Sequence, residues 1–103
     1  MGGVEALTWL ESSEQACLDR LIEWLRIPSI STDPQYKGET RKAAEWAAAH
    51  LEASGLKAEL IETGDPAGSG HPIVLATSEP SADYKGPHVL FYGHYDVQPS
   101  DPD

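Results

Sequence analysis

Apolar residues in the first quarter of the chain recur with the spacing of a helix. Four of them follow one another at i, i+3, i+4 and i+7, which places them on one helical face. They are Leu18, Leu21, Ile22 and Leu25. The helix is predicted to end at Pro28, because proline disfavours helical backbone in the residue before it.

The start of this helix has two interpretations. Ser12 with Gln15 has the spacing of a capping box, which would begin the helix at that point. The apolar pattern also extends back through Val4, Leu7 and Leu10, which would give one longer helix.

A second helix is predicted after a loop. Residues 29–38 are rich in turn formers and indicate a loop. From about Thr40 to Ser54 a helical pattern returns, and Gly55 suits its C-terminal cap. One face carries Ala43, Ala47, His50 and Leu51, with Trp46 beside them. The small alanines predict close packing of this helix on a sheet.

After Gly55 the spacing changes to that of strands. Residues 56–63, LKAELIET, alternate between apolar and polar, as in a half-buried strand. Two further strand-like segments follow, PIVLATS at 72–78 and PHVLFYG at 87–93. We therefore expect an α/β fold of two helices followed by three strands, near 57–62, 72–78 and 88–93, with the helix at 40–54 packed on the sheet.

The third of these segments is apolar throughout. Val89, Leu90, Phe91 and Tyr92 form a continuous run, which is typical of a strand covered on both faces in the middle of an α/β sheet. A central strand needs a neighbour on each side. Since only three strands are predicted, we expect the sheet to be incomplete.

Length and charge narrow the class of protein. A chain of 103 residues forms one domain at most. Its formal charge of -10 argues against nucleic acid as a partner, because binding it needs a basic face. No apolar run is long enough to cross a bilayer, no secretory signal is visible, and Cys17 has no second cysteine to pair with. These features together favour the cytoplasm.

Most of the candidate functional residues have a simpler structural interpretation. The glycines at 64–70 match no nucleotide-binding fingerprint and precede a strand, so they indicate a surface turn. His50, His71 and His88 are interpreted as packing or surface residues. Ser29 and Ser31 lie in a loop without the G-x-S-x-G pattern of a nucleophile, so no Ser-His-Asp arrangement is predicted.

His94 and Asp96 stand apart because of their position. They directly follow the apolar strand, and ligands of α/β enzymes gather at the carboxyl ends of strands. In an extended backbone residues two apart point the same way, so His94 and Asp96 share a side while Tyr95 points opposite. A metal-bound imidazole commonly donates its other N–H to a carboxylate, a role that Asp96 could fill.

The sequence motif around these two residues is more specific for a family than their spacing alone. Leu90 to Pro99 reads LFYGHYDVQP, with Asp101-Pro102 after it, and this phrase resembles the first metal-binding segment of the co-catalytic zinc peptidases. That family includes carnosinase-like dipeptidases, aminoacylase, glutamate carboxypeptidases and succinyl-diaminopimelate desuccinylase. The upstream LRIPSIS, the AAEW of the second helix and Gly55-Leu56 also fit, so the resemblance covers nearly the whole chain.

The resemblance implies a site and a reaction. His94 would be a ligand of one of two zinc ions, with cobalt or manganese as replacements. Asp96 would be a catalytic residue that supports His94 without binding the metal itself. The substrate would be a dipeptide or an N-acyl amino acid, hydrolysed at its amide bond by water that the metal activates. The intact family also has a small inserted domain that often mediates dimerisation.

The same resemblance implies that much of the site is not present. A metal-bridging aspartate, a general-base glutamate and the remaining ligands have no counterpart in residues 1–103. We therefore expect these residues to be the N-terminal portion of a catalytic domain, inactive as given. The alternatives are a non-catalytic α/β binding module that keeps the fold without the chemistry, and an unrelated α/β domain with a chance His-x-Asp.

Overall fold

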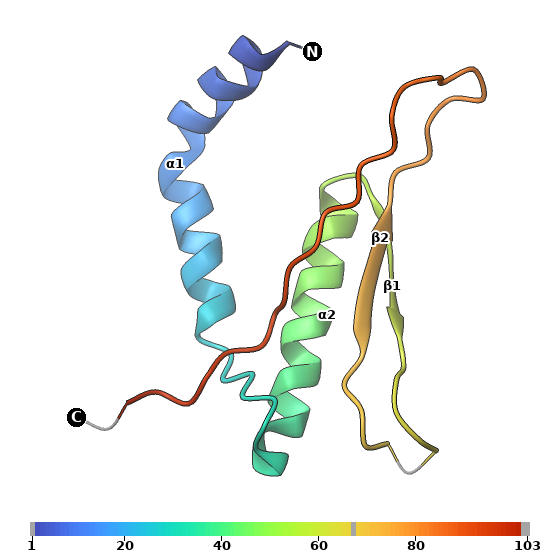
Figure 1. The fold of residues 1–103 in the computed structure, drawn as a ribbon. Coiled ribbons are helices and arrows are strands. Elements are labelled where there is room, and N and C mark those ends of the chain that lie inside the picture. Colours follow the sequence, from blue (N-terminus) through green and yellow to red (C-terminus); the bar gives the residue numbers. More distant parts are fainter. Residues whose placement is uncertain (1, 67, 102–103) are drawn as a thin grey trace.

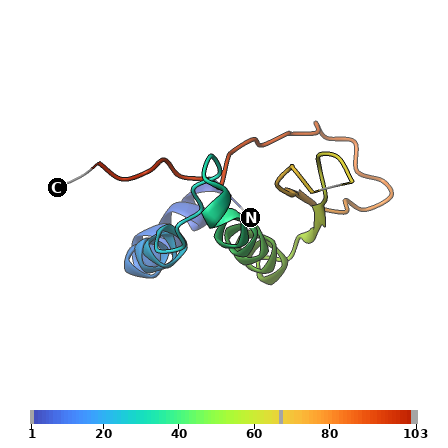
Figure 2. The same ribbon diagram turned by 90° about the horizontal axis from the view of Figure 1, so that it is seen from below.

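The computed structural model describes residues 2–66 and 68–101. The elements follow in the order α1 (Gly3–Leu25), the 3-10 helix η1 (Pro34–Tyr36), α2 (Lys37–Ala53), β1 (Lys57–Ile61) and β2 (Ile73–Thr77). Helix α2 lies between α1 on one side and the two strands on the other (Figures 1 and 2). No helix in this described part of the chain is long and apolar enough to cross a membrane.

Helix α1 follows the longer of the two predicted patterns. It begins at Gly3, so the apolar spacing back to Val4 is confirmed, and it ends at Leu25 as Pro28 predicts. The capping box is wrong, because Ser12 lies inside the helix and its hydroxyl donates to the Trp9 carbonyl at 3.0 Å. Gln15 donates instead to Asp19, at 2.8 Å. The helix-favouring residues on the N-terminal side of Ser12 extend the helix past that point.

Two tryptophans join α1 to α2. The rings of Trp24 and Trp46 stack with their centroids 5.3 Å apart and their planes 15° from parallel. Trp24 Nε1 also donates to the Ala43 carbonyl at 3.1 Å, so an indole of α1 reaches the backbone of α2. Trp46 stacks on His50 on its other side. Away from this seam α1 is open, and none of its residues is buried.

Helix α2 matches its prediction except at its start. It begins three residues early, at Lys37, because η1 leads directly into it and Asp33 caps that turn by accepting from the Gln35 N–H at 2.9 Å. It ends where expected, with Gly55 at a φ of +98°. Ala43 and Ala44 are completely buried. The close packing that the alanines predict is confirmed, because α2 contacts both β1 and β2.

Strands β1 and β2 form an antiparallel hairpin. Lys57 pairs with Thr77 at one end and Ile61 with Ile73 at the other. Both strands alternate between exposed and half-buried residues, as the sequence pattern of residues 56–63 predicts for the first of them. The half-buried face carries Ala58 and Leu60 of β1 opposite Ala76 and Val74 of β2. The glycine-rich segment between the strands is the hairpin connection, as expected.

The predicted third strand is wrong. Val89, Leu90, Phe91 and Tyr92 carry no strand assignment and are 86%, 92%, 92% and 84% exposed. Within the described residues their backbone groups have no hydrogen-bond partner. The apolar run keeps the composition of a strand, but a strand forms only where another backbone pairs with it. The structure is therefore a small α/β fold with a two-stranded sheet across its described ranges.

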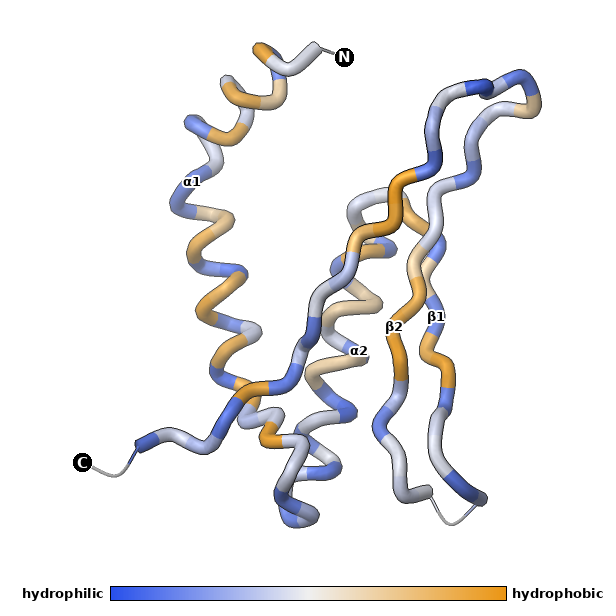
Figure 3. The backbone as a smooth tube through the Cα atoms, in the orientation of Figure 1, coloured by the Kyte–Doolittle hydropathy of each residue, from blue (hydrophilic) through white to orange (hydrophobic). Residues whose placement is uncertain are grey.

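After β2 the chain turns and comes back across α2 toward the loop that follows α1 (Figure 1). Figure 2 shows this returning segment, residues 78–101, passing along one side of the helices. Figure 3 shows its apolar stretch, together with the apolar positions repeated along α1. The returning segment meets the α1 loop through a parallel bridge between Ile30 and Val97. This bridge fixes the position of His94 and Asp96.

Candidate metal site

Backbone contacts hold the segment that carries His94 and Asp96 against the loop after α1. The Val97 N–H donates to the Ser29 carbonyl at 3.0 Å. Ser29 is only 1% exposed, and its hydroxyl donates to the Tyr95 carbonyl at 2.9 Å. A buried hydroxyl that lacked a partner would cost stability, so this bond ties the two segments together.

The Tyr95 side chain anchors the same segment to the hairpin. Its hydroxyl donates to the carbonyl of Pro72, just before β2, at 2.6 Å. Burial raises the pKa of Tyr95, and the Asp96 carboxylate raises it further, so the phenol stays protonated and remains a donor. Tyr95 is therefore held by the residue before β2, while His94 and Asp96 bond to each other.

His94 and Asp96 form the centre of the candidate site. His94 Nδ1 lies 2.7 Å from Asp96 Oδ1 and 3.2 Å from the Asp96 carbonyl oxygen. Both of these oxygens are acceptors, so Nδ1 carries the hydrogen and donates it. In a neutral imidazole the other nitrogen, Nε2, then keeps its lone pair. Nε2 has no hydrogen-bond partner among the residues that the structure describes, and the side chain is 72% exposed.

The second carboxylate oxygen of Asp96 is also occupied. The Ser31 hydroxyl donates to Asp96 Oδ2 at 2.6 Å. This bond is the main reason why the pKa of Asp96 lies below its usual value of 3.8, since a donor stabilises the charged form. Burial opposes the shift, and the hydrogen bond from His94 adds to it. Asp96 is therefore an ionised acceptor with one donor on each oxygen.

The order in which Ser31, Asp96 and His94 are bonded excludes the catalytic arrangement of a serine hydrolase. In a serine hydrolase the imidazole contacts the serine hydroxyl and takes its proton. Here the carboxylate lies between the two, with Ser31 and His94 bonded to its opposite oxygens. His94 therefore does not activate Ser31 as a nucleophile.

The donor set fits a single zinc ligand. A histidine that donates Nδ1–H to a carboxylate and presents Nε2 is the usual form of a zinc-binding imidazole. Zinc in catalytic sites usually takes three protein ligands. Across residues 2–66 and 68–101 no group of three histidines, cysteines or carboxylates lies close enough together to hold a metal ion. His94 would therefore be one ligand of a larger set.

The other histidines have structural roles, in line with their sequence interpretation. His71 Nε2 lies 2.9 Å from the Ser31 carbonyl and donates to it. His50 stacks on Trp46, and His88 meets the ring of Tyr84 edge to face with the centroids 6.3 Å apart. A hydrogen bond accounts for the position of the His71 ring, and aromatic contacts account for those of His50 and His88.

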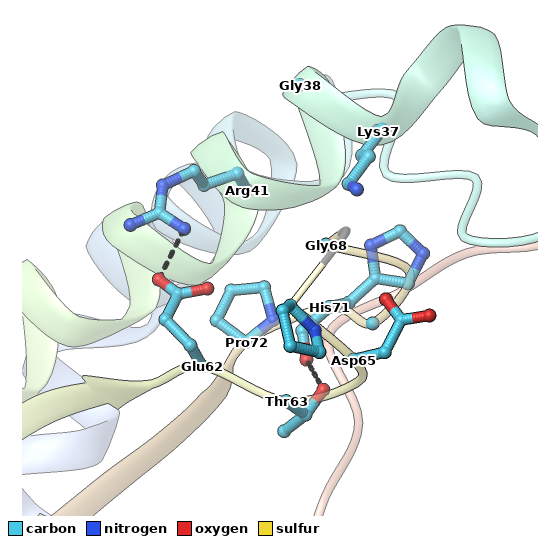
Figure 4. A pocket seen from close by; sticks show the side chains of 11 residues that line it. Lys37, Gly38, Arg41, Glu62, Thr63, Asp65, Gly68, His71 and Pro72 are labelled. Atoms are coloured by element: carbon cyan, nitrogen blue, oxygen red, sulfur yellow. Dashed lines mark hydrogen bonds and ion pairs between the residues drawn. The ribbon is translucent and has the colours of Figure 1, made fainter.

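An open hollow lies between the start of α2 and the hairpin connection (Figure 4). Lys37 and Arg41 of α2 line it, which would suit an anion. Arg41, however, is bonded to Glu62 at 2.6 Å, and Asp65 brings a further negative charge to the same lining. The charges of the hollow are nearly balanced, so it presents no anion site.

Sequence reasoning missed Ser29 and Ser31 as parts of the site. They lie 66 and 65 residues before the groups that they contact, and no periodic pattern connects segments that far apart. The available signal was the position of two serines in LRIPSIS, a stretch that resembles the same family as the metal-binding phrase. Nothing in that stretch indicated the contact itself.

No family model matches the chain, and no solved structure matches it.

Proposed function

We propose that this chain contributes the first metal ligand of a zinc-dependent peptidase that hydrolyses dipeptides or related amide bonds. Residues 1–103 form the N-terminal portion of the catalytic domain in this proposal. His94 is the ligand through Nε2, and Asp96 supports it. The observation that carries the proposal is the 2.7 Å bond from His94 Nδ1 to Asp96 Oδ1, which leaves Nε2 as the atom that can bind a metal.

The surroundings of the pair support a metal role over a packing role. The half-buried His71, by comparison, has its Nε2 occupied by the Ser31 carbonyl. His94 is instead 72% exposed, and its carboxylate partner is fixed by Ser31. Zinc, when bound, supplies Lewis-acid activation of water for attack on an amide carbonyl. The contribution of this chain is to orient the His94 imidazole and to place the Asp96 carboxylate at its Nδ1.

The exposed apolar segment supports the view that further polypeptide completes the domain. Each side chain of Val89 to Tyr92 would contribute roughly 1.5–3 kcal/mol if it were fully buried. All four are more than 80% exposed, and only Gly93 separates them from His94. A strand that paired and covered this segment would bring other residues to the carboxyl end of the segment, where ligands gather. The remaining zinc ligands and the general base would come from such residues.

Equilibrium dialysis against zinc tests the metal role. We expect the chain to bind zinc weakly, because one histidine does not hold the ion tightly. His94→Ala should lower the bound zinc to the level of non-specific binding. Asp96→Ala should weaken binding roughly tenfold or more, as loss of a carboxylate behind a ligand histidine commonly does. His88→Ala is the matched control, since His88 lies six residues earlier and packs on Tyr84.

Equal zinc binding by the wild type and His94→Ala would refute the metal role. It would favour the alternative of an α/β binding module without the chemistry. Hydrolysis is a separate measurement. The chain alone should not cleave a panel of dipeptides with zinc, cobalt or manganese, because no third carboxylate or imidazole of its described residues joins the pair to hold a metal.

A further inference from the structure

The loop after α1 does more than hold the metal segment in place. Four contacts secure that loop at Ser29, Ile30 and Ser31. The Ser29 hydroxyl and carbonyl bond to Tyr95 and Val97, Ile30 bridges to Val97, and the Ser31 carbonyl accepts from His71 Nε2. The backbone that carries the Ser31 hydroxyl is thus fixed independently of Asp96.

The Ser31 hydroxyl acts on a side chain that otherwise has freedom to turn. The terminal torsion of an aspartate is broad, so its carboxylate plane is set by its partners and not by a sharp rotamer. Asp96 is 41% exposed, and packing alone does not hold it. The 2.6 Å bond from Ser31 to Oδ2 fixes one oxygen and leaves Oδ1 directed at His94 Nδ1, 2.7 Å away.

We propose that Ser31 is a positioning residue for the metal site. It orients Asp96 so that His94 is held in the Nδ1–H tautomer, with Nε2 directed at the metal. The metal part of this inference rests on the proposed function. The hydrogen-bonded line from Ser31 through Asp96 to His94 exists without a metal ion and is tested without one.

The test is nitrogen NMR of the histidine rings in the metal-free 103-residue chain, at a pH where imidazole is neutral. In the wild type His94 should be in the Nδ1–H form alone. Ser31→Ala should give a mixture of tautomers, so that the shifts of its two ring nitrogens move toward each other. Ser31→Thr keeps a hydroxyl and should restore the wild-type signals. Ser78→Ala is the control, because Ser78 is exposed and its hydroxyl makes no hydrogen bond in the described ranges.

The signals of His50, stacked on Trp46, report whether each variant is folded. If Ser31→Ala does not fold, Ser31→Cys replaces it, because a thiol of similar size is only a weak donor. That variant should give an intermediate mixture. Unchanged His94 signals in a folded Ser31→Ala or Ser31→Cys variant would overturn the inference, as would failure of Ser31→Thr to restore them.

These results are separate from the fate of the proposed function. If Ser31→Ala loses the Nδ1–H form but His94→Ala binds as much zinc as the wild type, Ser31 positions Asp96 and His94 is not a metal ligand. If His94→Ala loses zinc binding but Ser31→Ala keeps the Nδ1–H form, His94 is a metal ligand and Ser31 does not position it.

Discussion

Tyr95 connects the candidate site to the hairpin through a single hydroxyl. Tyr95→Phe removes the donor that the Pro72 carbonyl accepts at 2.6 Å, and Pro72 is buried. We expect the free energy of unfolding to fall by about 0.5–1.5 kcal/mol, the usual net value of such a bond. Denaturant unfolding measures the change.

Tyr92→Phe provides the matched control for this prediction. Tyr92 lies three residues earlier, is 84% exposed, and its hydroxyl bonds to none of the described residues. Its removal should leave stability unchanged within about 0.5 kcal/mol. Equal effects of the two substitutions would mean that the Tyr95 bond contributes nothing.

At this scale the sequence predicted the local geometry of the site and missed its distant partners. The i, i+2 spacing is sufficient to place His94 and Asp96 on one side, where they bond to each other, because the alternation of an extended chain is local. The partners of Asp96 and Tyr95 depend on how the returning segment crosses the α1 loop. That crossing follows from the whole chain, and no local pattern encodes it.

Among the elements, the C-terminal end of α2 gives the most direct test. Gly55 has a φ of +98°, and nothing lies within 4 Å of a Cβ added there. Gly55→Ala should therefore destabilise the protein by about 1–2 kcal/mol through backbone strain alone. Thermal unfolding measures it.

Gly38→Ala should have the opposite sign. Gly38 lies in the first turn of α2, where an added Cβ also meets nothing, but its φ suits any residue. Alanine there is expected to stabilise by about 0.5–1 kcal/mol because it favours helix. Destabilisation by Gly38→Ala, or no effect of Gly55→Ala, would contradict the placement of this helix.

Elements defined by local periodicity could be predicted, and the element defined by pairing could not. The two helices and the hairpin depend on contacts close in sequence, and their predicted positions are confirmed to within a few residues. Val89 to Tyr92 have the composition of a strand, but a strand also needs a partner backbone. In the part of the chain that the structure describes, β1 and β2 pair with each other and not with this segment.

This unpaired segment is expected to promote association. Apolar residues in extended backbone with free edges offer a template for pairing with another chain. Leu90→Lys should lower the concentration-dependent association seen by light scattering. Leu7→Lys is the control, because it makes the same change of charge at an exposed position within a helix. An equal reduction by both would assign the effect to charge and not to the strand.

The whole molecule is less compact than a typical domain of the same length. Its radius of gyration is 16.7 Å, whereas a compact domain of 100 residues has one of about 13 Å. Helix α1 joins α2 at the tryptophan seam and buries no residue, and the segment before His94 is exposed on both faces. These uncovered surfaces support the proposal that further polypeptide covers this part of the chain.

The most direct test of the account is a zinc titration of the chain followed at the histidine ring nitrogens. Coordination by His94 should shift its Nε2 signal strongly, while its Nδ1 signal remains that of a hydrogen-bonded N–H donor to Asp96. The rings of His50, His71 and His88 should change little, because packing or a backbone carbonyl occupies them. A shift at any of those rings that equals or exceeds the shift at His94, or no change at His94 Nε2, would contradict the central claim that His94 is a metal ligand.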